Sequence, residues 1–383
     1  MVSDASKQTR HAFLVDDAGS AARATALSKL SLQDVHEARL LLRGDSVIDW
    51  HRLALRSMDD VRRLLLVNGL DPDRPEDITR LEDLRAQAVR YVVDTLGLRI
   101  EPELATGVPA MELPLLASGR GRHQRSACTL LKVMHIIYHL DARELRTALS
   151  VPDNLLYAMI EQSVVTMFDE LRRAGVPVAE FSWSRKTRPS MVTKLLVKRD
   201  TSAARLFDRL RFRLVVAKKA DLLPTLHVML QRFIPFNYVL PGQTVNRLVD
   251  LAPIERRIAK SRDVLALTSE DRAESDNEFS GRGYQVLNFV ADLPVRVDRL
   301  LEGTEYVGLP GSLVFVLAEF QILDRASAET NEQGESSHEQ YKRRQHMRVK
   351  ERMLREPKPS ASERGDGTKS GKRRSKRRGS DPT

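Results

Sequence analysis

The chain has 383 residues, of which 42% are hydrophobic and 30% are charged, and its formal net charge is +10 at pH 7. A chain of this length and composition can bury a sizeable core, so we expect two folded units and a tail. The single cysteine, Cys128, excludes an intramolecular disulfide framework and suits a reducing compartment. No apolar run approaches the roughly 20 residues of a membrane-spanning helix, and the first residues lack the apolar segment of a secretory signal. We therefore predict a cytoplasmic protein with no membrane partner.

Residues 1–125 are predicted to form a helical region. Apolar residues recur at helical spacing over 31–43, 59–67 and 76–96, and Ser31 is the expected N-cap of the first helix. Residues 101–125 are rich in Pro and Gly and predict a mobile connection. A helical pair is then expected over 128–149 and 152–174.

A basic segment follows the helical pair. Residues 186–194 have the sequence KTRPSMVTK, which predicts a turn or helix start carrying Lys186, Arg188, Ser190 and Lys194. Cations around a hydroxyl group are suited to clamping phosphate groups. The alternative interpretation of these cations is an ordinary basic surface.

Two predicted strands carry charged residues. Asp208 comes just before a strand over 212–216 that contains Arg213, and 221–232 predicts an amphipathic helix that packs on the sheet. Over 314–322, alternation places the apolar residues on one face and puts Glu319 and Gln321 on the other. A half-solvated strand would explain this carboxylate without any function, whereas a catalytic site would explain it together with the neighbouring motifs.

The positive charge is concentrated at the C-terminal end. Residues 343–383 contain 15 Lys and Arg and 5 Asp and Glu, which accounts for the whole net charge. Such a segment cannot bury enough apolar surface to fold alone, so we predict a disordered basic tail over 356–383. Its charge favours contact with RNA or the ribosome, or simply a solubilising role, and the sequence does not choose between the two.

Five segments, in their order and spacing, resemble signatures of the RelA/SpoT alarmone synthetases. Residues 186–194 are similar to the family's Lys-x-x-x-Ser-Ile-x-x-Lys, and 208–216 to its Asp-Leu-x-Gly-x-Arg strand. Residues 283–288, GYQVLN, are similar to Gly-Tyr-Gln-Ser-Leu-His, and the strand around Glu319 to Glu-x-Gln-Ile-Arg-Thr. In the last motif, Glu332, Gly334, His338, Tyr341 and Lys342 match Glu-x-Gly-x-x-x-His-x-x-Tyr-Lys without a gap. Together the segments cover roughly residues 180–345, under half of the chain.

The resemblance implies a fold and a reaction. The fold would be α+β, with a mixed, nucleotidyltransferase-like β-sheet flanked by helices. The helical N-terminal region would cover 1–125, the synthetase-like domain with its leading helices 126–355, and the disordered tail 356–383. The reaction would be Mg²⁺-dependent transfer of pyrophosphate from ATP to the 3′-hydroxyl of a guanine nucleotide, a chemistry that depends chiefly on positioning and electrostatics.

The resemblance also implies roles for individual residues. Asp208 and Glu319 would be the catalytic residues and the Mg²⁺ ligands. The ATP phosphates would be bound by Lys186, Arg188, Ser190, Lys194 and Arg213. The acceptor would be bound by Gly283, Tyr284, Gln285 and Asn288, with Tyr284 stacked on the guanine. Gln321, His338 and Lys342 would support the site.

Several positions depart from the family pattern, and most of them belong to the acceptor half. Ser280, Arg282 and Asn288 stand where the family has Lys, Asn and His, and Leu323-Asp324 stands where it has Arg-Thr. Two other functions therefore stay open: transfer to another acceptor such as a tRNA 3′ end, and a catalytically degenerate module that binds nucleotide or RNA.

A histidine pair in the helical region suggests a second chemistry. His135 and His139 share a helix face at i, i+4 and could bind a metal. Many alarmone enzymes carry a histidine–aspartate phosphohydrolase domain, which needs an adjacent His-Asp pair. Here Leu140 separates His139 from Asp141, so we favour a packed or surface pair and expect no hydrolase activity.

Overall fold

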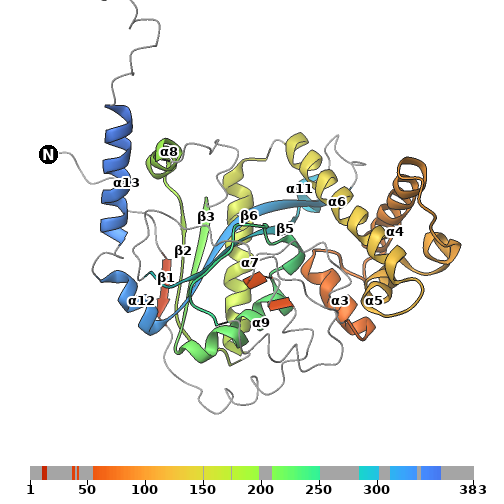
Figure 1. The fold of residues 1–383 in the computed structure, drawn as a ribbon, viewed down its shortest axis with the longest axis horizontal. Coiled ribbons are helices and arrows are strands. Elements are labelled where there is room, and N and C mark those ends of the chain that lie inside the picture. Colours follow the sequence, from red (N-terminus) through yellow and green to blue (C-terminus); the bar gives the residue numbers. More distant parts are fainter. Residues whose placement is uncertain are drawn as a thin grey trace, which may run out of the picture.

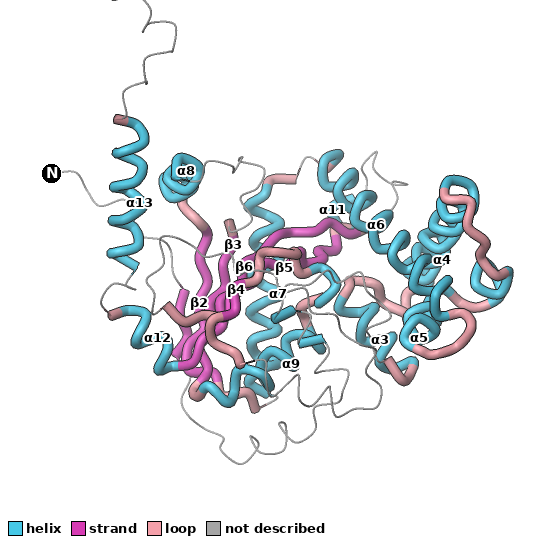
Figure 2. The backbone as a smooth tube through the Cα atoms, in the orientation of Figure 1, coloured by secondary structure: helices cyan, strands magenta, loops and turns pink. Residues whose placement is uncertain are grey.

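The computed structural model describes residues 11–14, 37–38, 41–42, 55–149, 151–173, 175–197, 209–250, 284–301, 311–333 and 338–354. These parts form helices around a central mixed sheet (Figures 1 and 2), so the predicted α+β class is confirmed. In this part of the chain, no helix combines the length and the apolar character needed to cross a membrane. The predicted tail, 356–383, lies outside the described residues.

The N-terminal helices begin at residues suited to capping. α3 (Met58–Val67) starts after Ser57, whose Oγ accepts a hydrogen bond from Asp60 N at 3.2 Å while its own N–H donates to the Asp60 carboxylate. α4 (Pro75–Arg90) has proline in its first turn, where no N–H is needed, and ends in the π-helical turn Tyr91–Thr95. The helices predicted over 59–67 and 76–96 are thus confirmed. Of the helix predicted over 31–43, residues 37–38 and 41–42 are described, and they are helical and buried.

The prediction of a mobile connection over 101–125 is wrong. This segment forms the turns Glu103–Gly107 and Ala110–Glu112 and the short helix α5 (Leu113–Ser118). Leu104 and Leu113 have no exposed surface. The apolar residues therefore anchor the segment to the core, and Pro114 lies in the first turn of α5, where proline is tolerated.

Two long helices follow, as predicted. α6 (Gln124–Ala148) packs against α4 and α5 on one side and against the sheet on the other. α7 (Asp153–Arg173) carries buried apolar residues at helical spacing and contacts three strands of the sheet. The two helices thus connect the N-terminal region to the sheet (Figure 1).

The sheet has six strands in the order β1-β2-β3-β6-β5-β4. The strands are β1 (His11–Leu14), β2 (Val178–Arg185), β3 (Leu210–Val216), β4 (Val245–Asn246), β5 (Leu287–Arg296) and β6 (Leu313–Asp324). Within the described part of the chain, β3 and β6 pair in parallel and the other neighbours pair antiparallel. The strands predicted over 212–216 and 314–322 correspond to β3 and β6, which lie side by side at the centre.

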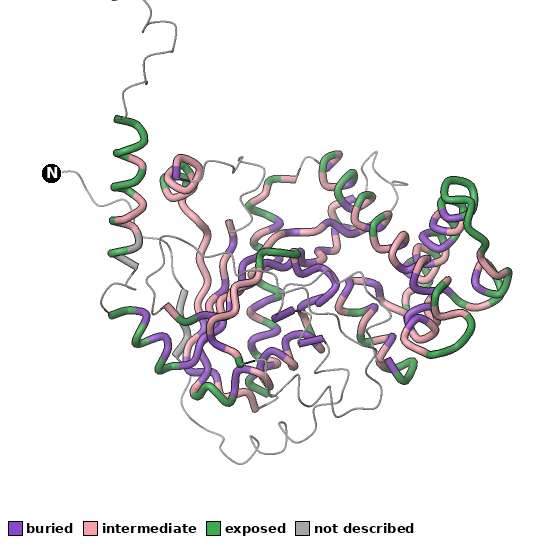
Figure 3. The backbone as a smooth tube through the Cα atoms, viewed as in Figure 1, coloured by how far each residue is buried: buried purple, intermediate pink, exposed green. Residues whose placement is uncertain are grey.

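One face of the sheet is apolar. Four phenylalanine rings stack across it, with centroid separations of 6.3, 5.4 and 5.4 Å, in the order Phe181, Phe212, Phe320 and Phe289. α7 covers this face, with Phe168 stacked on Phe181, and so does α9 (Leu222–Arg232), which corresponds to the helix predicted over 221–232. Figure 3 shows the resulting buried layer through the sheet, α7 and α9. The opposite face, between α6 and α12 (Arg325–Glu332), carries the polar residues described below.

Two helices stand beside the β2 end of the sheet (Figure 1). α8 (Arg188–Val197) packs against α13 (His338–Met353), and Arg352 Nη1 donates to the Leu196 carbonyl at 2.5 Å. The side chains of α13 are mostly exposed (Figure 3), and many of them are basic. α13 is thus a basic helix that leads toward the C-terminal end of the chain.

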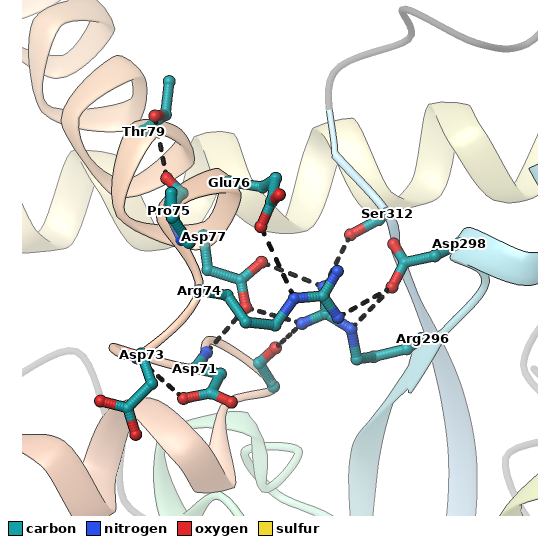
Figure 4. Close-up of polar contacts among 11 residues, drawn as sticks. Asp71, Asp73, Arg74, Pro75, Glu76, Asp77, Thr79, Arg296, Asp298 and Ser312 are labelled. Atoms are coloured by element: carbon teal, nitrogen blue, oxygen red, sulfur yellow. Dashed lines mark hydrogen bonds and ion pairs between the residues drawn. The ribbon is translucent and has the colours of Figure 1, made fainter.

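A polar network centred on Arg296 joins the N-terminal helices to the end of β5 (Figure 4). Arg296 donates to both oxygens of Asp77 on α4, at 2.7 and 3.0 Å, and to Asp298 at 2.9 Å. Its remaining contacts are the Gly69 carbonyl at 2.9 Å and Ser312 Oγ at 3.3 Å. Buried residues on both sides of residue 125 also belong to one continuous core. The division into units at 125 and 355 remains a prediction.

Candidate functional site

The polar face of the sheet is built by register. In the parallel pair β3–β6, Arg211 lies opposite Glu319 and Arg213 opposite Gln321. On the other side of β6, Asn288 lies opposite Gln321 and Val290 opposite Glu319. Because side chains alternate along a strand, these residues all point away from the phenylalanine layer. We call Arg211, Arg213, Asn288, Glu319 and Gln321 the polar strip.

Glu319 lies at the centre of the polar strip and is buried, with 6% of its side chain exposed. Its Oε2 accepts from Arg211 Nε at 2.9 Å, and its Oε1 accepts from Gln321 Nε2 at 3.2 Å. The strand is central in the sheet, and Glu319 is buried although Phe315, Leu317 and Gln321 on the same face are partly exposed, so a solvated position does not explain this carboxylate. A buried carboxylate is costly unless it is paired, and Arg211 supplies that pairing.

Tyr284 reaches the polar strip from the segment just before β5. Burial raises the pKa of its phenol above the usual value, and among the nearby charges Arg211 and Arg213 act in the opposite direction while Glu319 acts in the same direction. Tyr284 is thus close enough to all three residues to feel their charges. Because Tyr284 is only partly buried, one side of it can contact a ligand.

α12 holds the segment that carries Tyr284. Asn331 Oδ1 accepts from Gln285 N at 3.0 Å, and Asn331 Nδ2 donates to the Gln285 carbonyl at 2.6 Å. Ser327 Oγ contacts the side-chain oxygen of Gln285 at 3.2 Å. Asp324, the N-cap of α12, accepts from Ser327 N at 3.2 Å and from Ser327 Oγ at 2.7 Å. Gln285 is thus an anchor for the loop.

Three buried polar atoms around the polar strip have no hydrogen-bond partner among the described residues. They are Arg213 Nε, Asn288 Oδ1 and Asp292 Oδ1. Asp292 continues the same face of β5 two residues beyond Val290, and Arg213 also lies 3.5 Å from the exposed carboxylate of Glu332. Unsatisfied buried donors and acceptors are costly, so their grouping indicates a place for a polar ligand or for water.

The predicted donor-binding segment lies at the edge of the polar face. Lys186 directly follows β2, and its N–H donates to the Arg209 carbonyl at 2.8 Å, next to the start of β3. Arg188 is the first residue of α8 and is exposed, and Ser190 Oγ accepts from Thr187 Oγ1 at 3.0 Å. Lys194 lies about one turn beyond Ser190 along α8. The segment is therefore close to Arg211 along the sheet edge.

The other predicted site residues lie elsewhere or outside the described part. Asp208, Gly283, Ser280 and Arg282 lie outside the described residues, as does the side chain of His338. Lys342 is half-buried on α13, a helix that packs against α8. The structure thus brings together Arg213, Tyr284, Asn288, Glu319 and Gln321 of the predicted set.

Sequence reasoning missed Arg211 and the anchors on α12. Arg211 has the same strand parity as Arg213, so its face could have been read from the alternation, but its pairing with Glu319 depends on the β3–β6 register. Ser327 and Asn331 lie in a polar stretch whose contacts with Gln285 depend on the tertiary fold. Asp324, noted only as a departure from the family pattern, has a clear structural role as a helix cap.

Glu319 is the described carboxylate best placed to contact Mg²⁺ at this site. Each of its oxygens accepts one hydrogen bond, which leaves lone pairs for a cation, and Mg²⁺ usually takes one or two carboxylates and completes its shell with phosphates and water. Among the described residues, no group of three or more His, Cys, Asp and Glu side chains could hold a metal ion. The site therefore fits Mg²⁺ that arrives with a phosphorylated ligand.

The histidine pair of α6 makes packing and polar contacts. The His135 ring stacks on Tyr238 at 4.5 Å, and His139 Nε2 lies 2.7 Å from Asp292 Oδ2. Asp141 forms an ion pair with Arg80 of α4 rather than with either histidine.

No family model matches the chain, and no curated protein matches it. Solved structures that resemble it include small alarmone synthetase 2 from Bacillus subtilis, at 15% identity, TM-score 0.28, covering 51% of this chain and 92% of that one. Small alarmone synthetase 1 from the same organism gives 12% identity, TM-score 0.28 and coverages of 57% and 90%. A GTP pyrophosphokinase family protein from Streptococcus pneumoniae has 13% sequence identity and a TM-score of 0.28, and the match covers 52% of this chain and 83% of that one. At these TM-scores and identities, the likenesses do not establish a fold family or an activity for this chain, and any assignment has to come from its own residues.

Proposed function

We propose that the chain is a divergent alarmone-synthetase-like enzyme that transfers pyrophosphate from ATP to the 3′-hydroxyl of a guanine nucleotide. The observation that carries this proposal is the polar strip: a buried Glu319 flanked by two arginines and Tyr284, with unsatisfied polar atoms beside it. This reaction requires cations for a triphosphate, a carboxylate and an aromatic face for a base, and these residue types converge here.

The proposed roles follow from position. Arg211 and Arg213 lie beside Glu319 and can each offer guanidinium hydrogen bonds to phosphate oxygens. Lys186, Arg188, Ser190 and Lys194, at the edge of the same face, are proposed to hold the donor's phosphates. Tyr284, fixed by the contacts of Gln285 with α12, is proposed to stack on the acceptor base.

Mg²⁺ is proposed as the cofactor, held by Glu319 and by Asp208, with the phosphates completing its shell. When bound, it would neutralise charge that develops on the transferred phosphates. The chain's own residues would bind and orient the substrates. Arg211 would then share its hydrogen bonds between Glu319 and a phosphate oxygen, which its five donors permit.

The experiment incubates the purified full-length protein with γ-labelled ATP and Mg²⁺ and, in separate reactions, with GDP, GTP or bulk tRNA. Products are separated by chromatography. We expect label in a guanine tetra- or pentaphosphate, and we expect Glu319→Gln to reduce its formation by about 100-fold or more, because the carboxylate charge is lost with little change of shape. Glu329→Gln, on the exposed side of α12, is the matched control and should retain full activity.

The other outcomes separate the remaining functions. Wild-type rates in the folded Glu319→Gln protein would contradict the proposed site. Label on tRNA would favour a tRNA 3′ end as acceptor, a second candidate supported by the exposed, basic helix α13 that packs against α8. Saturable nucleotide binding without any Glu319-dependent transfer would favour a regulatory binding module.

A further inference from the structure

A histidine–aspartate pair lies on the polar face, one step along the sheet from Glu319. Asp292 belongs to β5 and pairs with Leu317, which precedes Glu319 by two residues on β6. Two residues along a strand span roughly 7 Å. Asp292 Oδ2 lies 2.7 Å from Nε2 of His139, which reaches across from α6. The proposed function does not use either residue.

The environment of the pair fixes the orientation of the imidazole. Asp292 is 8% exposed and is held by the strand, whereas 43% of the His139 side chain is exposed. The His139 ring also packs edge-on against Phe315, at 4.9 Å between centroids, and lies 5.5 Å from the ring of Tyr238. An ionised carboxylate can only accept a hydrogen bond, so beside ionised Asp292 a neutral imidazole would carry its hydrogen on Nε2 and its lone pair on Nδ1. The buried partner therefore holds a half-exposed base.

A second observation makes this part of the face a place for a polar ligand or for water. Asp292 Oδ1 and Asn288 Oδ1 are both buried and have no hydrogen-bond partner among the described residues, and both side chains are on the polar face of β5. They bracket Val290, the register partner of Glu319. A polar ligand that passes Glu319 along β5 would contact Asn288 at one end and the His139–Asp292 pair at the other.

We infer that His139 is the general base of the proposed reaction and that Asp292 is its positioning residue. The acceptor's ribose hydroxyl gives its proton to His139 Nδ1, and its oxygen forms a bond to the β-phosphorus of ATP. The bond from that phosphorus to the oxygen of the α-phosphate breaks, and AMP leaves with the electron pair. His139 then returns the proton to solvent. This inference rests on the proposed function and adds a residue outside the recognised motifs.

The groups that face His139 are few and named. Among the described residues, they are His135 from α6, Asp292 from β5 and the phenol of Tyr238 from the turn Phe236–Tyr238. Burial lowers the pKa of His135 to about 4, and burial raises the pKa values of Tyr138 and Tyr238. His139 and Asp292 are thus the hydrogen-bonded pair among these groups, and His139 is the member of the pair that a ligand can reach.

The test compares transfer rates of full-length wild type, His139→Gln, Asp292→Asn and His346→Gln across pH 5 to 9. A glutamine amide can keep the bond to Asp292 but cannot act as a base, so His139→Gln should lose about 100-fold in kcat with little change in KM. It should also lose the acidic limb of the pH–rate profile. Asp292→Asn should show a smaller loss with the limb displaced. His346, exposed on α13, is the matched control and should behave as wild type.

A second measurement does not depend on turnover. In the protein with ¹⁵N-labelled histidine, GDP added without ATP should shift the His139 ring resonances and leave those of His346 in place. An active wild type with an equally active His139→Gln protein would overturn the inference and leave the proposed function standing. If the wild type is active but its His139 ring resonances do not shift when GDP is added, the inference about His139 is also overturned. Absence of transfer by the wild type would overturn the proposed function itself, and the inference with it.

Discussion

Two buried carboxylates on the polar face each accept a hydrogen bond from a nitrogen of a neighbouring element. Glu319 is buried and depends on Arg211, one strand away, and Asp292 is buried and depends on His139. For Asp292, burial raises the carboxyl pKa while the hydrogen bond and charge of His139 lower it, with burial dominant. A charge held by a single partner is sensitive to ligands, because any group that binds the partner also alters the charge.

His135 provides a residue-scale prediction for stability. Burial, and to a smaller extent His139, lower its pKa from 6.5 to about 4. Between pH 6.5 and about pH 4, His135 is therefore protonated in the unfolded chain but not in the folded chain. The free energy of unfolding should fall as the pH decreases through this window, by up to roughly 3 kcal/mol. His135→Phe keeps a ring against Tyr238 and removes this group. Urea unfolding at pH 7 and pH 5 should show a smaller pH difference in the variant than in wild type.

His346→Phe is the control for that measurement, since residue 346 is exposed on α13. Its pH difference should equal that of wild type. An unchanged pH difference in His135→Phe would mean that His135 is protonated in the folded protein, contrary to its buried contact with Tyr238.

At the scale of elements, α12 connects the two halves of the candidate site. Its cap, Asp324, is the last residue of β6, the strand that carries Glu319, and its Ser327 and Asn331 fix the loop that carries Tyr284. Strand, cap, helix and loop therefore form one continuous chain of contacts. A substitution of the cap should therefore weaken binding of the acceptor nucleotide and leave binding of the donor unchanged.

Asp324→Ala should therefore reduce both stability and acceptor binding. Loss of an N-cap costs about 1 kcal/mol, and here the side-chain bond from Ser327 is lost as well. We expect a lower melting temperature and a several-fold higher KM for the guanine nucleotide, with the KM for ATP unchanged. Asp324→Asn keeps an acceptor for Ser327 N and should lie close to wild type. An equal rise in both KM values would show that α12 does not act on Tyr284 selectively.

The elements themselves were largely predictable, whereas their pairing was not. The alternation around Glu319 and the helical spacing of α3, α4, α6, α7 and α9 are local patterns, so the sequence was sufficient for them. The Pro and Gly residues of 101–125 locally favour a mobile connection, whereas burial of Leu104 and Leu113, a tertiary effect, anchors the segment to the core. The partnership of Arg211 with Glu319 depends on the β3–β6 register, which the sequence does not reveal for two residues 108 positions apart. β1 and β4, of 4 and 2 residues, are too short for a period to be seen.

At the scale of the whole molecule, the described N-terminal helices share a buried core with the sheet. One continuous core contains residues of α3, α4 and α6 together with those of β5 and β6. The Arg296 network adds a polar connection between α4 and the end of β5 (Figure 4). Burial acts to lower the pKa of Arg296, but Asp77 and Asp298 outweigh it and raise the pKa. The guanidinium is thus charged, and its three nitrogens all donate hydrogen bonds.

Arg296→Met should consequently unfold the molecule more easily as a whole. It leaves Asp77, whose side chain is 5% exposed, as a buried carboxylate without its cation, which costs about 3–5 kcal/mol.

Arg74→Met is the matched control. The Arg74 side chain is 41% exposed and lies 3.3 Å from Asp298 and 3.7 Å from Glu76, so the loss of these exposed ion pairs should cost less than about 1 kcal/mol. The double variant Arg296→Met/Asp77→Asn removes the stranded charge and should regain a large part of the loss. The measurement is urea unfolding in proteins that also carry Trp50→Phe, so that Trp183 on β2 is the remaining tryptophan, followed both by tryptophan fluorescence and by helical circular dichroism. If the two signals separate in wild type, the helices and the sheet unfold independently, and the network does not couple them.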